Sequence, residues 1–169
     1  FGFNEGAVLK AIYKDFRIKK KTVSRAVNSN QKTVTLGVDV KNLLDGSGPS
    51  KVVYILGYKS KQLIEVKVIW GKPVQNNPNA KVIVSTANQL KHYFGQKKYQ
   101  KNGLVFYRKL SEEVILFFQR IDKKGRTAHL LLSNLKNKDS KEDENITLVL
   151  SYIEKHENPD VFKIKAPLL

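Results

Sequence analysis

Apolar and polar side chains alternate most clearly in the middle of the chain, over residues 63–70. A period of two is typical of a β-strand with one buried face, because successive side chains of a strand point to opposite sides. We therefore expect Glu65 and Lys67 to face water. The side chains expected to line a core are Ile64, Val66, Val68 and Trp70.

The preceding run, residues 52–56, is apolar on both faces. Such a run is typical of a strand in the interior of a sheet that is covered on both sides. The polar segment 59–62 separates it from the alternating run. Together the two runs predict a central antiparallel hairpin, around which the other elements are arranged.

Two segments have apolar side chains at helical spacing, residues 4–16 and 80–94. Asn4 and Asn79 are suited to cap the starts of these helices, because an asparagine side chain can accept hydrogen bonds from the first helical amides. Gly95 is placed to end the second helix. The sequence therefore predicts one helix before the central hairpin and one after it.

The other apolar runs alternate like strands and are separated by polar, glycine-containing or asparagine-containing loops. They predict strands at residues 33–40, 104–110, 114–121, 127–135 and 146–153, with a short edge strand at 161–164. Residues 122–126 contain a late glycine, which is common in a hairpin loop. The second half of the chain is therefore expected to be mostly strand.

This order predicts an α+β fold: a large twisted antiparallel sheet of about 7–8 strands, joined by meander and hairpin connections, with two helices packed on one face. The later strands could instead curl the sheet towards a half-barrel. At 169 residues the chain fits a single domain, 1–169, with room for a substantial core. No sequence repeat at a fixed period and no second domain boundary is evident.

The net charge of +16 lies in the first part of the chain. Residues 1–110 hold 18 Lys and 3 Arg against 5 acidic residues, whereas residues 111–169 are balanced. Such a charge favours an acidic partner or nucleic acid. The excess of lysine over arginine favours a purely compositional origin equally well, since bidentate recognition of phosphates prefers arginine.

Basic side chains, with one tyrosine among them, are the candidates for contacting a polyanion or an acidic partner. They are Arg17, Lys19, Lys20, Lys21, Lys59, Lys61, Lys91, Lys97, Lys98, Tyr99 and Lys101. Residues 17–21 could instead offset the dipole at the end of the first helix. Residues 96–102 could be a solvated turn rather than a surface for phosphates and bases.

No motif for catalysis or for a cofactor is present. Cysteine is absent, which excludes thiolate chemistry and disulfides. The three histidines, His92, His129 and His156, lack metal-ligand spacing, and the adjacent Glu112 and Glu113 would point to opposite faces of a strand. The glycines of residues 45–50 are not spaced as in a P-loop. We therefore expect no enzyme, no cofactor and no metal site.

Three aromatic residues, Tyr54, Tyr58 and Trp70, lie on the central hairpin. At strand spacing, aromatic side chains are expected to pack in a core rather than to form a ligand platform. The prediction is that all three are core residues.

The sequence favours a non-enzymatic, exported, periplasmic or secreted module that binds a partner or supports an assembly. Its basic surface would engage an acidic protein or an envelope component. Export is expected because the chain starts at Phe1 and contains no methionine, as a processed precursor would, although a trimmed cytoplasmic protein would look the same. No apolar run approaches the ~20 residues of a membrane span. The alternatives are a nucleic-acid-binding domain that uses residues 1–110 and, less favoured, a small enzyme with a cleft between helix and sheet.

Overall fold

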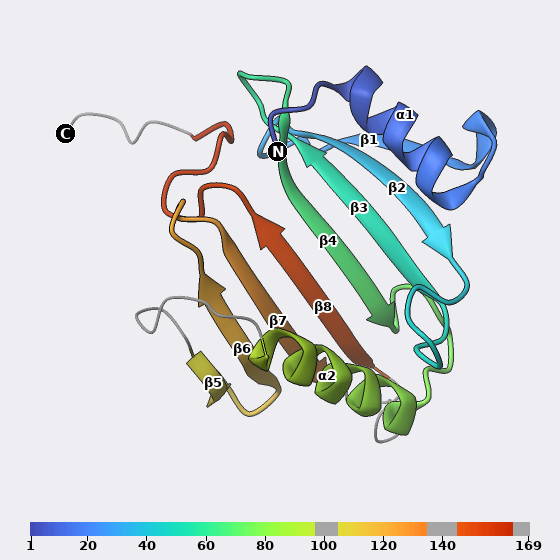
Figure 1. The fold of residues 1–169 in the computed structure, drawn as a ribbon, viewed down its shortest axis with the longest axis vertical. Coiled ribbons are helices and arrows are strands. Elements are labelled where there is room, and N and C mark those ends of the chain that lie inside the picture. The colour runs from blue at the N-terminus through green and yellow to red at the C-terminus, as the bar shows by residue number, and fades with distance from the viewer. Residues whose placement is uncertain (97–104, 135–144, 164–169) are drawn as a thin grey trace.

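The computed structural model describes residues 1–96, 105–134 and 145–163. These residues form two α-helices and one antiparallel sheet of eight strands (Figure 1). The α+β fold predicted from the sequence is therefore confirmed.

The first half of the chain is a helix followed by four strands. Helix α1 spans Glu5–Phe16, and the side-chain oxygen of its N-cap, Asn4, accepts a hydrogen bond from the backbone N–H of Ala7 at 2.9 Å. A 3₁₀ turn, η1, follows at Lys20–Thr22. The strands are β1 at Ser24–Val27, β2 at Val34–Val40, β3 at Ser50–Leu56 and β4 at Leu63–Gly71. The predicted cap and the predicted central hairpin, β3–β4, are confirmed.

The second half repeats this order. Helix α2 spans Ala80–Gly95, and Asn79 caps it by accepting hydrogen bonds from the backbone N–H groups of Lys81 and Val82. The strands are β5 at Val105–Lys109, β6 at Val114–Ile121, β7 at Thr127–Asn134 and β8 at Ile146–Ile153. Each of these elements was predicted to within two residues wherever the structure describes its ends.

The two halves meet at one pair of neighbouring strands, β4 and β8, which we call the seam. The strand order is β1-β2-β3-β4-β8-β7-β6-β5, and every neighbouring pair is antiparallel. The order places the last strand of each half in the centre of the sheet and the first strand of each half at an edge. The architecture is therefore a twofold repeat of a helix and a four-stranded meander, although no repeat is visible in the sequence.

Both helices lie on the same face of the sheet (Figure 1). Val8 and Ile12 of α1, and Ile83, Ala87 and Leu90 of α2, belong to one buried apolar cluster with side chains of six strands. Trp70 on β4 is fully buried in this cluster. Apolar side chains on one stripe of each helix thus cover one face and leave the other without a helix.

The predicted core face of β4 is correct for Val66, Val68 and Trp70 but wrong for Ile64. The register between β3 and β4 shifts after Ile55, so that Leu56 pairs with Leu63 while Ile55 pairs with Glu65. One extra residue on β4 reverses the direction of the side chains before it. As a result Leu63 enters the core and Ile64 turns to the opposite face.

Three other features of the structure differ from the predictions. Strand β1 was not predicted, because its four residues are all exposed and show no alternation. Residues 161–163 form no strand, although a short edge strand was predicted at 161–164; the backbone N–H of Phe162 instead donates to the carbonyl of Gln31 at 2.8 Å. Only one face of β3 is covered by helix, so the predicted cover on both faces is also wrong.

Neither helix of the described residues is both long and apolar enough to cross a bilayer.

Candidate functional site

The sheet face opposite the helices, which we call the open face, carries a row of apolar side chains. Cross-strand pairing places Ile69 of β4, Val149 of β8, Leu131 of β7 and Leu116 of β6 side by side. Because side chains alternate along a strand, Ile69 points away from the core that holds Val68 and Trp70. Lys51 on β3 and Arg108 on β5 end the row. This largely half-buried apolar row thus lies on a face that no described helix covers, with Arg108 at one end and, at the other, Lys51, whose ammonium lies 3.7 Å from the carboxylate of Asp39.

A groove of about 1250 Å³ opens at one end of the open face. Its floor is a second cross-strand row, formed by Ile55, Glu65 and Ile153. Ile64, which the irregularity in β4 turns to this face, also lines it. The β3–β4 turn forms one wall. The other wall is the segment after β8, residues 154–163, which we call the strap.

The strap is fastened to the β3–β4 turn by Asp160. The backbone N–H groups of Lys59 and Ser60 donate hydrogen bonds to the two carboxylate oxygens of Asp160, at 3.0 and 2.8 Å. The backbone N–H of Tyr58 donates to the Asp160 carbonyl at 2.8 Å. The Tyr58 ring also meets the Phe162 ring edge to face, with centroids 5.5 Å apart. The groove wall therefore depends on contacts between segments far apart in the sequence.

These hydrogen bonds set the charge state of Asp160. Burial acts to raise its pKa, but the hydrogen bonds from Ser60 and Lys59 and the charge of Lys59 outweigh burial, so the pKa lies below the ordinary value. A carboxylate that accepts several N–H groups is stabilised in its ionised form. Asp160 is thus ionised, and its carboxylate is bound by the backbone amides of the β3–β4 turn.

Most acidic side chains around the groove are already paired, whereas several basic ones are exposed to solvent. The carboxylate of Glu65 lies 3.5 Å from the ammonium of Lys67, and Asp160 is occupied by the turn. Glu154 is then the remaining acid among the lining residues. Three lining lysines have exposed side chains, namely Lys59, Lys155 and Lys163. The rim therefore presents more accessible cations than anions.

Two histidines mark where the strap passes the open face. His129 on β7 is half-buried, and its ring meets that of His156 on the strap at 6.1 Å between centroids. Burial, followed by the charges of His156 and Lys67, lowers the pKa of His129. His129 pairs with Gln119 of β6 across the strand pair.

The basic residues singled out from the sequence lie in separate places. Lys59 and Lys61 belong to the β3–β4 turn at the groove, close to the start of α1, since the Leu63 N–H donates to the Phe3 carbonyl at 2.8 Å. Beyond the other end of α1, which is about 18 Å long, come Arg17, Lys19, Lys20 and Lys21. Lys91 lies on α2 in the second half. Lys97, Lys98, Tyr99 and Lys101 are outside the described residues.

Sequence reasoning missed the strap as part of the site. Asn158, Pro159 and Asp160 have the composition of a turn, and no local pattern indicates which distant segment a turn will contact. Of the three aromatic residues expected in the core, Trp70 and Tyr54 pack there, whereas Tyr58 lies at the groove. The aspartate after a proline was the one signal that could have suggested a capping carboxylate.

Within the described residues, no group of three or more His, Asp or Glu side chains is placed to hold a metal ion. Comparison of the chain with models of known protein families, with curated proteins and with solved structures found no significant match to any of them.

Proposed function

We propose that this protein is a non-enzymatic binding or assembly module that takes a segment of an acidic partner protein on its open face. The observation that carries the proposal is the continuity of the apolar row with the groove. Ile69 and Glu65 lie on the same face of β4, and their cross-strand neighbours Val149 and Ile153 lie on the same face of β8. Half-buried apolar side chains that continue into a groove with a polar rim suit a protein interaction site.

The charges support an acidic partner. The chain carries a net charge of +16, and the accessible cations at the groove outnumber its accessible anions. Complementary charge speeds association and selects partners even where it adds little affinity. An envelope component with acidic groups would meet the same surface.

Nucleic acid is a weaker candidate. The cations suggested from the sequence are divided between the groove turn, the far end of α1 and helix α2. A nucleic-acid strand is normally followed by a continuous basic track. The described residues contribute separate clusters, which suits local contacts with a protein better.

A charge-reversal experiment tests the proposal. The groove variant combines Lys59→Glu, Lys155→Glu and Lys163→Glu, and the control variant combines Lys10→Glu, Lys14→Glu and Lys81→Glu, which are exposed on the helices. The probe is a short soluble peptide of alternating Glu and Leu, with binding followed by amide NMR shifts at Ile55, Glu65 and Ile153. We expect the groove variant to weaken binding at these amides at least about tenfold, while the control variant retains it.

Equal weakening by the two variants would mean that only overall charge attracts the peptide, and the proposal would be wrong. A duplex or single-stranded DNA probe that shifts the same amides, with affinity falling steeply with salt, would favour the nucleic-acid alternative instead.

A further inference from the structure

Strand β5 is an edge of the sheet with exposed side chains on both of its faces. In the described part of the chain it pairs only with β6. Residues 106–109 are all exposed. An edge strand presents backbone N–H and C=O groups that can pair with a further strand. Backbone hydrogen-bonding groups and accessible side chains therefore coincide at β5, on either side of an irregularity at Tyr107, whose φ is 54° and which has no pairing partner on β6.

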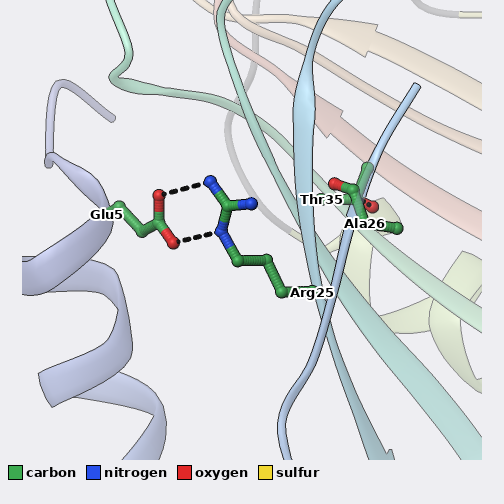
Figure 2. A network of polar contacts seen from close by, with 4 residues as sticks. All are labelled: Glu5, Arg25, Ala26 and Thr35. Carbon is green, nitrogen blue, oxygen red and sulfur yellow. Dashed lines mark hydrogen bonds and ion pairs between the residues drawn. The ribbon is translucent and has the colours of Figure 1, made fainter. Parts of the chain in front are cut away.

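The opposite edge strand, β1, is also exposed, but its cation is paired. On β1, Arg25 donates to the carboxylate of Glu5 on α1, with 2.7 Å between Nε and Oε1, so that the helix reaches the edge strand (Figure 2). Within the described chain, Arg108 and Lys109 of β5 have no carboxylate partner at all. The two halves thus share a topology but differ at their edges.

Large aromatic rings lie exposed on β5. Phe106 is 44% exposed and Tyr107 is 60% exposed. The Tyr107 ring lies 5.2 Å from the Phe117 ring, and the ammonium of Lys91 on α2 lies 5.4 Å from the centre of the Tyr107 ring. An exposed aromatic side chain that is itself held in place offers apolar contact area at a small entropic cost.

We propose that the edge of β5 is a second docking site, separate from the groove, at which an extended acidic segment of a partner protein adds a ninth strand to the sheet. The partner backbone would pair with β5, and its apolar side chains would contact Phe106 and Tyr107. Its carboxylates would meet Lys91, Arg108 and Lys109. Strand addition of this kind derives affinity from backbone hydrogen bonds and specificity from alternate side chains.

Charge argues against a second copy of this chain as the occupant. Antiparallel pairing of two β5 strands centred on Tyr107 would set Arg108 across from Phe106 and Lys109 across from Val105. It would still gather four cations, Arg108 and Lys109 of each copy, on one short strand pair, where their mutual repulsion is not compensated. An acidic segment instead neutralises the same cations, which is why the proposal commits to that partner.

The test uses two peptides with the same side chains. The probe repeats Glu-Glu-Val-Val, so that each of its faces carries both acidic and apolar side chains. The control peptide carries N-methyl groups on alternate residues along one edge, which removes the donors needed for pairing. Hydrogen–deuterium exchange of the full chain locates each peptide. We expect the unmethylated probe to slow exchange at Val105–Lys109 at least about tenfold and the methylated peptide to leave it unchanged, because paired amides are protected.

Two variants separate this site from the groove. Combined Arg108→Glu and Lys109→Glu substitutions are expected to abolish protection of β5, whereas the groove variant described above is expected to retain it. Emission from the buried Trp70 reports whether each variant is folded. Equal protection by the methylated peptide, loss of β5 protection in the groove variant, or preferential protection by an oligothymidine would each overturn the proposal.

Discussion

Asp160 and Ser60 are 100 residues apart in the sequence, yet the backbone N–H of Ser60 donates a hydrogen bond to Asp160 Oδ2 at 2.8 Å. Because Lys59 donates to the other carboxylate oxygen, one side chain fixes the strap to the β3–β4 turn. This carboxylate therefore contributes two of the contacts that hold the wall of the groove, beside the Tyr58–Phe162 ring contact and the backbone hydrogen bonds.

Replacing this carboxylate should loosen the wall of the groove. Asp160→Ala leaves the amides of Lys59 and Ser60 without their acceptor, and we expect the free energy of unfolding to fall by about 1–2 kcal/mol. Amide exchange at these two residues should accelerate. Glu157→Ala, at an exposed strap position, is the control and should change neither quantity. Unchanged exchange in Asp160→Ala would show that other contacts hold the strap.

Acid should destabilise the fold through the same group. The pKa of Asp160 in the folded protein lies below its value in the unfolded chain, so its stabilising contribution is complete above about pH 4 and is lost as the pH falls through the folded value. Asp160→Asn should therefore flatten the dependence of unfolding free energy on pH below about pH 4. Chemical denaturation over a series of acidic pH values measures this slope. A slope equal to that of the wild type would assign the acid sensitivity to other carboxylates, such as Asp122, whose pKa is also lowered.

His129 should act at a higher pH. Burial and the nearby charges of His156 and Lys67 lower its pKa, so the folded protein binds this proton less readily than the unfolded chain does. Stability is then lost as the pH falls from about 6.5 through the folded value. We expect His129→Gln to reduce the loss of stability on going from about pH 7 to pH 5. His92→Gln, which changes an exposed histidine on α2, should leave that loss unchanged.

Most elements could be predicted because their patterns are local. The capped helix α2, with Ile83, Ala87 and Leu90 at helical spacing, and the alternating strand β8 are both specified by neighbouring residues. Strand β1 could not be predicted in this way. Its side chains are exposed, so the hydrophobic pattern does not distinguish it from a loop, and only its pairing with β2 makes it a strand.

The orientation of Ile64 depends on a partner strand rather than on its own neighbours. At the start of β4 both Leu63 and Ile64 are apolar, so the sequence pattern alone does not decide which of them faces the core. The shifted register with β3 places Leu63 there. A one-residue irregularity of this kind reverses which side chain faces the core. Because Ile64 lies at the groove, this error concerned the candidate site as well as the core.

The site was less predictable than the fold. Lys59 was identified from its charge alone, whereas its neighbour Asp160 contributes through a contact between residues 101 positions apart in the sequence. Side-chain type indicates what a residue can bind but not where a distant segment will lie. The twofold repeat was hidden for a related reason, since a shared topology requires only a similar order of apolar patterns and not the same residues.

Gly71 provides a test of the seam between the two halves. Its φ of 96° is unfavourable for other residues, and an added β-carbon would collide with the backbone carbonyl oxygen of Ile146 across the β4–β8 pair. We expect Gly71→Ala to lower the free energy of unfolding by at least about 2 kcal/mol, because strain and displacement of the backbone add together.

The control is Gly95→Ala at the end of α2, where nothing lies within 4 Å of an added β-carbon, and it should be neutral or slightly stabilising. Thermal denaturation followed by Trp70 emission compares the two variants. A Gly71→Ala protein as stable as the wild type would show that the seam can shift to accommodate a side chain, and the two halves would then be less tightly joined than their eight-stranded sheet implies.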